Sequence, residues 1–430
     1  MNSYLDLLKS KKALKEYYQH NLDIVVLNNI TTNPLKDYIE YQCASREIYA
    51  RIEFGDYDNI AQNANDDSID GKVVLVFWEL ANLIHGLEYK IESFTDIQIQ
   101  ELEEKVKAEI LFAFQGLEKA ALVILNRFSA LPFSYNRTQE GKLESLASRL
   151  NQFCFEHSPK VFKWINPDKC IVASGIEQSI DYKGFLKNKV LYKHAFYWNY
   201  SQLIQPYLNA VCGKINKLLA LDCDNTLWKG ILGEDGVSGI EMNENTFRGQ
   251  AFAAAQYQAM ALGKKGVLLA LASKNNPEDV NAVLKDQQAT IIKDDSLVAK
   301  KVNWDPKGQN LEALANELNI GVDSFVFVDD SDFEVQLMKD QLSEVTTLQV
   351  NPKGVEYYRD QFSWDNYFVQ LNESKEDANK LEQYKQNVKR ADEERKFKDF
   401  DGFLKSLDLQ LDININNEKL IPRMAQMTQK

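Results

Sequence analysis

Hydrophobic positions in the first half of the chain fall into short continuous runs and longer stretches with helical spacing. The runs predict buried strands, and the spaced stretches predict amphipathic helices. A charged helix is expected within the first 20 residues. Beyond it we expect strand 24–29, helix 35–50, strand 52–54, strand 73–79, helix 98–117, strand 121–126, helix 142–155 and strand 170–173. This alternation is typical of a doubly wound parallel sheet.

The alternation resumes after a turn-rich stretch at 205–213. The run 218–221 has no side chain that can charge, which predicts a strand buried on both faces. The stretch 228–239 is rich in glycine and acidic residues and predicts a hairpin or loop. The remaining elements are expected as helix 246–263, strand 267–272, a helix from 277, helix 309–319 and strand 325–328. We therefore predict the α/β class, with a second doubly wound parallel sheet.

The end of the chain differs in character. A strongly charged helix is expected at 373–398, and its charges are those of a solvated face between domains. A strand-like alternation at 407–415 and the start of a helix at 420–427 follow. We divide the chain into an α/β domain at 1–210, a second at 211–370, and a linker helix with the beginning of a further domain at 371–430.

Pairs of aspartates follow two expected strands of the second domain. Asp222 and Asp224 follow the first of them, and strand alternation points both the same way, into the crevice at the carboxyl end of the sheet. Asp329 and Asp330 follow the last of them. Carboxylates crowded at buried strand ends repel one another, and a cation relieves that repulsion. Oxygen-only ligands suit Mg²⁺, so we predict a Mg²⁺ site formed by these four aspartates.

Charge and composition exclude several classes of partner. The chain has 430 residues, 44% hydrophobic and 26% charged, as in ordinary globular proteins. Its net charge of −13 argues against binding a nucleic-acid backbone, although it leaves room for a local basic patch. The apolar runs are too short to span a bilayer, so we predict neither nucleic-acid nor membrane partners.

Histidine and cysteine usage limits the chemistry and the compartment. The four histidines all precede Gly213, which excludes a Ser-His-Asp or Cys-His mechanism confined to the second domain. The number of cysteines is odd and no C-x-x-C occurs, which favours a reduced, cytoplasmic protein. The five are Cys43, Cys154, Cys170, Cys212 and Cys223.

The string KLLALDCDNTLWKGILGEDG at 217–236 contains D-x-D-x-T directly after an apolar strand. A lone D-x-D is also a common turn or helix cap. In this context it resembles motif one of the haloacid dehalogenase superfamily, and DCDNTLWKG…GEDG resembles the FkbH-like branch. The resemblance implies that Asp222 attacks phosphorus and that Asp224 is the general acid/base, with Mg²⁺ as the cofactor. Thr226 belongs to the same motif and is a candidate substrate-binding residue.

Two further positions match the superfamily by their place in the chain. Ser273 ends the second core strand, where motif two places a hydroxyl that binds a phosphoryl oxygen; a turn before the helix at 277 is the alternative. Lys274 and Asn275 beside it are candidate substrate-binding residues. Lys307 is our prediction for the motif-three cation, with Lys300 and Lys301 as nearby rivals.

The pair Asp329-Asp330 matches motif four. In related sites the second acid usually reaches the cation, so we expect Asp330 to be the direct ligand and Asp329 its support. Glu334, one helical turn further on, is expected to orient Lys307. About fifty residues separate motifs one and two, which leaves little room for a separate cap domain. The resemblance therefore implies a Rossmann-like domain with a minimal cap.

The first domain resembles the amino-terminal domain of FkbH-like proteins, which is SGNH-hydrolase-like in shape. Its first strand leads into Asn28-Asn29-Ile30-Thr31-Thr32 with no serine, and residues 181–194 contain no D-x-x-H, so we expect no catalysis by this domain alone. Four residues at strand ends could line a recognition crevice, or could equally be capping and turn residues. They are Asn29, Trp78, Asn82 and Asn126.

FkbH-like proteins continue into an acetyltransferase-like domain, relative to which this chain looks truncated. The resemblance implies a phosphatase and glyceryl transferase. Such a protein takes glyceryl from 1,3-bisphosphoglycerate, removes phosphate and loads the acyl group onto an acyl carrier protein, in polyketide or surface polysaccharide synthesis. Two alternatives stay open: a plain phosphatase acting on a sugar phosphate or phosphoprotein, and a non-catalytic carrier-binding module. Cys223 as an acyl carrier is less favoured than a buried core cysteine, because neighbouring carboxylates raise the pKa of a thiol.

Overall fold

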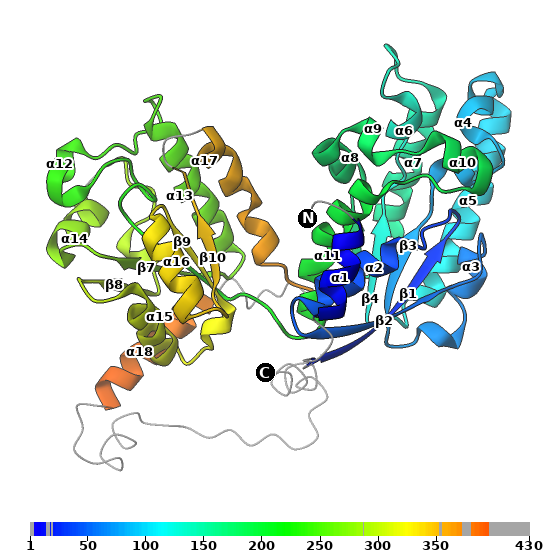
Figure 1. Cartoon of the computed structure of the whole chain (residues 1–430). Helices are drawn as coiled ribbons and strands as arrows, with labels where there is room; N and C mark the ends of the chain where they lie inside the picture. The colour runs from blue at the N-terminus through cyan, green and yellow to red at the C-terminus, as the bar shows by residue number, and fades with distance from the viewer. Residues whose placement is uncertain are drawn as a thin grey trace, which may run out of the picture.

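The computed structural model describes residues 4–13, 18, 20–286, 288–351, 355–371 and 380–394. Two lobes follow one another along the chain, each built on a five-stranded sheet (Figure 1). Every strand pairing in the two sheets is parallel. The predicted α/β class with two parallel sheets is therefore confirmed.

The first sheet has the strand order β2-β1-β3-β4-β5. Helices cover both of its faces, and β3 and β4 are accordingly buried at every position. Helices α2 and α11 pack on one face, and α5 and α7 on the other. The bounds are β1 (His20–Asn28), β2 (Ile48–Phe54), β3 (Val73–Phe77), β4 (Leu122–Asn126), β5 (Phe162–Ile165), α2 (Leu35–Ala44), α5 (Asp96–Leu117), α7 (Lys142–His157) and α11 (His194–Val211).

Shorter elements complete the first lobe. Thr95 caps α5 by accepting a hydrogen bond from the backbone N–H of Gln98, in a capping box that fixes where this long helix begins. The shorter helices are α1 (Tyr4–Ala13), α3 (Ile60–Asn63), η1 (Asp67–Ile69), η2 (Leu80–Asn82), α4 (Leu87–Lys90), η3 (Ile91–Ser93), α6 (Leu131–Ser134), α8 (Asp168–Ser174), α9 (Ile176–Ser179) and α10 (Tyr182–Asn188).

The second sheet has the order β10-β9-β6-β7-β8, so the run predicted to be buried forms its central strand, β6. Helices α13, α14 and α17 with η6 pack on one face, and α15 and α16 on the other. The bounds are β6 (Leu218–Leu221), β7 (Leu268–Ser273), β8 (Ala299–Val302), β9 (Phe325–Asp329), β10 (Thr346–Gln349), α12 (Leu232–Gly239), α13 (Gly249–Lys264), α14 (Pro277–Asp286), η4 (Asp294–Ser296), α15 (Lys307–Leu318), η5 (Val322–Ser324), α16 (Asp332–Gln341), α17 (Val355–Asp360) and η6 (Gln361–Tyr367).

Two predictions of secondary structure are wrong, and a third is confirmed in part. The stretch 170–173 lies in helix α8, where Cys170 and Ile171 are buried but Val172 is 79% exposed, and the fifth strand is instead β5. The helix predicted at 35–50 ends at Ala44, because 48–54 alternates between buried and exposed positions as an edge strand does. The hairpin or loop predicted at 228–239 is present in part, because Lys229 and Glu241 pair as an antiparallel bridge. The residues between them also contain the short helix α12, kinked at Gly236, whose positive φ of 67° suits glycine.

The charged helix predicted at 373–398 is present within the described residues as α18 (Lys380–Glu394), which packs on α15 through Leu381 and Tyr384. The strand at 407–415, the helix at 420–427 and the predicted beginning of an acetyltransferase-like domain lie outside the described residues. In the part of the chain that the structure describes, no helix combines the length and apolar character needed to cross a bilayer.

The polar residues at the carboxyl ends of β1, β3 and β4 are hydrogen-bonded within the first lobe. Asn29 bonds the backbone of Glu79 through its amide N–H and its carbonyl oxygen, at 2.9 and 2.6 Å. Asn82 donates to the carbonyl oxygen of Asn29 at 2.5 Å, and Asn126 accepts from the hydroxyl of Tyr200 at 2.7 Å. These contacts favour the capping and turn interpretation of the predicted crevice residues. Trp78, the fourth, is buried beside Phe128.

Glu79 is an acidic side chain buried among these groups. Its Oε2 accepts a hydrogen bond from the Tyr192 hydroxyl at 2.8 Å, whereas its Oε1 has no partner in the described structure. Burial raises the pKa of Glu79 from 4.5 to about 7, since a charged carboxylate loses its hydration there. The protonated carboxyl is therefore favoured in the folded lobe, and stability is lost as pH rises from about 4.5 through about 7.

We predict that Glu79→Gln weakens this pH dependence, because the amide cannot ionise. The free energy of unfolding of the first lobe should fall between pH 5 and pH 8 by about 1–3 kcal/mol less in the variant than in the wild type. Hydrogen exchange of the β3 amides at both pH values measures this difference. Glu118→Gln, at an exposed position of the same lobe, is the control. Equal pH dependence in all three proteins would contradict the assignment.

Candidate active site

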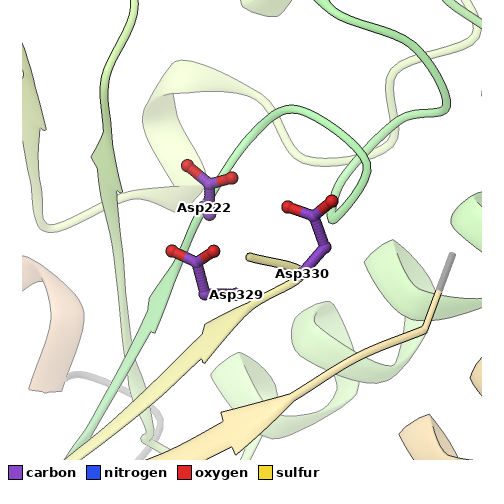
Figure 2. Close-up of side chains that lie close together, drawn as sticks. All are labelled: Asp222, Asp329 and Asp330. Carbon is purple, nitrogen blue, oxygen red and sulfur yellow. The ribbon is translucent and has the colours of Figure 1, made fainter. Parts of the chain in front are cut away.

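The carboxyl ends of β6, β7 and β9 meet at one edge of the second sheet. Because β6 lies between β7 and β9 and all three are parallel, the residues that end these strands are neighbours. Oxygens of Asp222, Asp329 and Asp330 lie within 4.8 Å of one another, and Figure 2 shows the three carboxylates side by side. We call these three residues the acid cluster.

Lys307 is the cation within the acid cluster. It begins α15, and its Nζ lies 2.8 Å from Asp222 Oδ1 and 2.6 Å from Asp329 Oδ2. Lys307 is 4% exposed and Asp329 is fully buried. Burial lowers the pKa of Lys307, but the charges of Asp222 and Asp329 outweigh burial, so its pKa is raised overall and the ammonium stays charged.

One ammonium does not balance three carboxylates. Burial, followed by the charge of Asp222, raises the pKa of Asp330 to about 6 and also raises the pKa of Asp329. The cluster therefore holds excess negative charge where hydration is poor, and a divalent cation would compensate it. All of the donors are carboxylate oxygens, which is the donor type that Mg²⁺ prefers, so the residues present fit this ion.

Asp224 is held by three hydrogen bonds next to the acid cluster. Its Oδ1 accepts from the indole Nε1 of Trp228 at 2.9 Å and from the backbone N–H of Leu232 at 3.1 Å, and its Oδ2 accepts from the Asn275 amide at 3.0 Å. Burial raises the pKa of Asp224 despite these bonds, which favour the charged form. The side chain of Asp224 is not a member of the cluster, so it would not contribute a carboxylate to the same ion.

Three of the other predicted site residues are buried, and the fourth, Lys274, forms an ion pair. Ser273 and Asn275 are buried beside Asp224, with the Asn275 amide 3.2 Å from Ser273 Oγ. Thr226 is buried, and its hydroxyl has no partner in the described structure. Lys274, in contrast, forms an ion pair at 2.6 Å with Glu334. The prediction that Glu334 orients Lys307 is therefore wrong, because Glu334 meets the end of β7 instead.

Lys300 and Lys301, the alternative candidates for the motif-three cation, have their ion-pair partners outside the acid cluster. Lys300 pairs with Asp294 and also donates to Asn281 at 2.6 Å, and Lys301 bonds Glu317 at 2.5 Å. Of the three candidates, Lys307 is the one among the aspartates. The thiol of Cys223 is fully buried, and burial and the charge of Asp222 raise its pKa well above the ordinary value, which opposes a reactive thiolate.

Sequence reasoning missed Trp228 as part of the site. The indole is fully buried and belongs to the core of the lobe, while its N–H binds Asp224 four residues earlier in the chain. Asn225 between them has a positive φ of 53°, a conformation that asparagine tolerates better than most residues, and this turn reverses the chain after β6. The spacing of an indole four residues after the second aspartate was the available signal.

Comparison with known proteins gives a fold match. No family model matches the chain, and no curated protein matches it. A solved structure of the N-terminal part of the protein BF1531 from Bacteroides fragilis, containing a phosphatase domain complexed with Mg, superposes with a TM-score of 0.72. It is 20% identical and covers 86% of this chain and 100% of that chain, and at this identity the similarity shows the fold alone.

Two weaker matches do not support any argument. An uncharacterized protein from Corynebacterium glutamicum has a TM-score of 0.25 at 15% identity, and the match covers 36% of this chain and 97% of that chain. The apo-structure of D-lactate dehydrogenase from Escherichia coli has a TM-score of 0.16 at 11% identity, with 87% and 97% covered. Neither describes the fold of this chain.

We predict that Lys307→Gln destabilises the second lobe by about 3–5 kcal/mol without divalent cations, because buried carboxylates lose their counter-charge. Adding Mg²⁺ should recover more stability in the variant than in the wild type, because the remaining site is more negative. Chemical unfolding with and without Mg²⁺ measures both effects. Lys300→Gln, at a surface ion pair, should change stability by at most about 1 kcal/mol. A Lys307 variant that behaves like this control would contradict the account.

Proposed function

We propose that this chain is a Mg²⁺-dependent phosphatase or phosphotransferase in which Asp222 is the nucleophile. The observation that supports this most is the acid cluster, in which Lys307 contacts Asp222 and Asp329, at the carboxyl edge of a parallel sheet. Ligands bind at that edge in open α/β sheets. The order D-x-D-x-T, Ser273, Lys307 and Asp329-Asp330 along the chain supports the same reaction class through its resemblance to the haloacid dehalogenase superfamily.

In this proposal Asp222 attacks the phosphoryl group in line. Lys307 Nζ lies 2.8 Å from Asp222 Oδ1 and holds the side chain that would be the nucleophile in place. Ser273 and Lys307 balance the charge of the phosphoryl oxygens, and an aspartyl phosphate forms as the leaving oxygen departs. Thr226, Asn275 and Lys274 are our candidates for contact with the rest of the substrate.

Asp224 is the general acid and base of the proposed reaction. It protonates the leaving oxygen and then takes a proton from the water that hydrolyses the aspartyl phosphate. Burial raises its pKa, which favours the proton-carrying form needed for the first of these steps. Trp228 and Asn275 fix its position by bonding different oxygens of the carboxylate, at 2.9 and 3.0 Å.

Asp222, Asp330 and the backbone carbonyl of Asp224 would hold Mg²⁺. Asp329 would act through Lys307, which it bonds at 2.6 Å. When bound, Mg²⁺ would neutralise negative charge on the transferring group. The contacts of the two neighbouring acids agree with these roles. Asp329 forms an ion pair with the Lys307 ammonium. Asp330 has a raised pKa and no lysine contact among the described residues.

We predict that Asp222→Asn abolishes phosphate release while the fold survives, because the amide keeps the size of the side chain and removes the nucleophile. Turnover should fall by at least about 10³-fold, and the circular dichroism spectrum should be unchanged. Phosphate release from 1,3-bisphosphoglycerate and from simple phosphomonoesters is the assay. Asp332→Asn, an exposed acid of the following helix, is the matched control. Retained activity in the Asp222 variant would exclude this mechanism.

The FkbH-like resemblance suggests a more specific reaction: dephosphorylation of a 1,3-bisphosphoglycerate-like substrate and transfer of glyceryl to an acyl carrier protein. The carrier thiol would attack the acyl carbon and displace the 1-phosphate, and Asp222 would attack phosphorus to remove the 3-phosphate. The segment between β6 and β7 contains only the helices α12 and α13, with no separate cap over the acid cluster. Trp304 and Phe333 follow β8 and β9 at the same edge and are 70% and 68% exposed. A site without a cap domain in this segment, beside exposed aromatic rings, would suit a substrate delivered on a protein.

The proposal also covers the cellular compartment of the protein and the role of its first lobe. All five cysteines are free thiols in the structure, which supports a reduced, cytoplasmic setting. The first lobe, SGNH-like by resemblance, would then serve recognition rather than catalysis, since residues 28–32 after the first strand contain no serine and residues 181–194 contain no D-x-x-H.

Carrier dependence separates glyceryl transfer from plain phosphatase activity. With a phosphopantetheinylated carrier protein, we predict faster phosphate release from 1,3-bisphosphoglycerate and a mass gain of the carrier by one glyceryl group. Trp304→Ala should raise KM for the carrier about tenfold without slowing release from a small phosphomonoester; Phe155→Ala, an exposed phenylalanine of the first lobe, is the control. Carrier-independent release from many esters would leave the plain phosphatase. Absence of Mg²⁺ binding would favour a non-catalytic carrier-binding module.

A further inference from the structure

A cleft of about 480 Å³ lies between the two lobes. The first lobe lines it with the turn before β2, with α8 and with α11, and the second lobe lines it with the start of β10 and the end of η6. Figure 1 shows α11 on the side of its lobe that faces the orange segment containing η6. The volume is within the range of pockets that bind small molecules, roughly 300–1,000 Å³.

Direct contacts between the lobes form the cleft. Lys214, in the segment that joins α11 to β6, donates to the carbonyl oxygen of Arg46 at 2.8 Å. Asn216 in the same segment donates to the carbonyl oxygen of Tyr367 at 2.9 Å. Leu371, after η6, packs against the core of the first lobe. A ligand bound here would therefore touch the two lobes and the segment that joins them.

The charge of the cleft is opposite to that of the chain. The protein has a net charge of −13, yet the residues lining the cleft include Arg46, Lys169 and Lys214 and no aspartate or glutamate. Lys169 has no ion-pair partner in the part of the chain that the structure describes. Lys214 pairs with Glu47, which lies outside the lining, at 3.3 Å, so Arg46 and Lys169 are the cations left to attract an anion. Low-dielectric walls strengthen that attraction.

The Arg46 side chain is held in a position where it could bind an anion. Its Nη1 donates to three acceptors at 3.1 Å, two on Gln42 and one on Ser45. Its Nε and Nη2 have no hydrogen-bond partner among the described residues, so they are available to a ligand. A guanidinium fixed through one nitrogen presents its other donors in a geometry that matches phosphate oxygens.

The neutral lining of the cleft suits hydroxyl groups. Pro206 lies inside α11 and has no N–H, so the helix cannot supply the usual donor to the carbonyl oxygen of Gln202, which also lines the cleft. Apolar side chains line part of the wall, among them Leu203, Ile215 and Val369. The lining also includes side-chain amides, which can both donate and accept, and three of which already donate to protein oxygens. They belong to Asn199, Gln202, Gln205, Asn209, Asn216 and Asn366.

We propose that this cleft binds a phosphorylated, hydroxyl-rich small molecule, such as a sugar phosphate or a nucleoside monophosphate. The cations would bind its phosphate, and the amides would bind its hydroxyl groups. The site is separate from the acid cluster: Asn216 precedes β6 and Thr346 begins β10, so the cleft lies at the amino ends of the second sheet. A bound molecule would bridge the lobes and fix their relative orientation.

Calorimetric titration of the full chain with glucose 6-phosphate and with adenosine monophosphate tests this proposal. EDTA removes Mg²⁺ and so suppresses phosphate binding at the acid cluster, and glucose is the uncharged control. We expect at least one of the phosphate esters to bind at a single site, with affinity lowered at least tenfold by Lys169→Gln and unchanged by Lys183→Gln, which lies outside the cleft.

Phosphate release with Mg²⁺ is measured on the same variants, so failure of the cleft and failure of the catalytic proposal are distinguishable. Lys169→Gln should retain full release, since it is remote from the acid cluster. If neither phosphate ester binds at millimolar concentration, or if the Lys169 and Lys183 variants bind equally well, the proposal is wrong. Equal binding of glucose would likewise overturn the role assigned to the cations.

Discussion

The contact of Lys307 with Asp222 and Asp329 is the interaction on which the second lobe depends. It joins the start of α15 to the ends of two neighbouring strands, β6 and β9, in a place where all three side chains are almost completely buried. A parallel sheet makes this possible, because it brings the carboxyl ends of adjacent strands to one edge. The same arrangement makes it costly, because burial removes the hydration of every charge placed there.

That cost explains why the polar groups around the acid cluster are held by specific hydrogen bonds. Asp224 next to the cluster is held by an indole, a backbone amide and an asparagine, each at hydrogen-bond distance. Lys307 contacts two of the three carboxylates, and the remaining excess of negative charge is what a divalent cation would compensate. Side chains that served only to hold the sheet together would not need an excess of negative charge. A site that binds a divalent cation and transfers a negatively charged group would use that excess. This contrast is the basis of the proposed chemistry.

The sequence predicted the sheet-forming runs and the acid residues because both depend on local pattern. Apolar runs define β6, β7 and β9, and the aspartates follow directly after two of them. Side-chain partners depend on tertiary placement, and here prediction was weaker: Glu334 meets Lys274, and the contact of Trp228 with Asp224 was missed. The short apolar run at 170–173 could not be distinguished from a strand by length or composition. In the structure Cys170 and Ile171 are both buried and Val172 is exposed, which fits one face of a helix and not the alternation of a half-buried strand.

The central claim is that Asp222 is a phosphorus-attacking nucleophile beside a Mg²⁺ site, and trapping tests it most directly. A crystal structure with Mg²⁺ and beryllium fluoride, which mimics a phosphoryl group on a carboxylate, would show what binds at this edge of the sheet. The account predicts beryllium fluoride on the Asp222 carboxylate, with Mg²⁺ in contact with Asp222 and Asp330. A fluoride adduct on another residue, or Mg²⁺ bound away from the acid cluster, would contradict it.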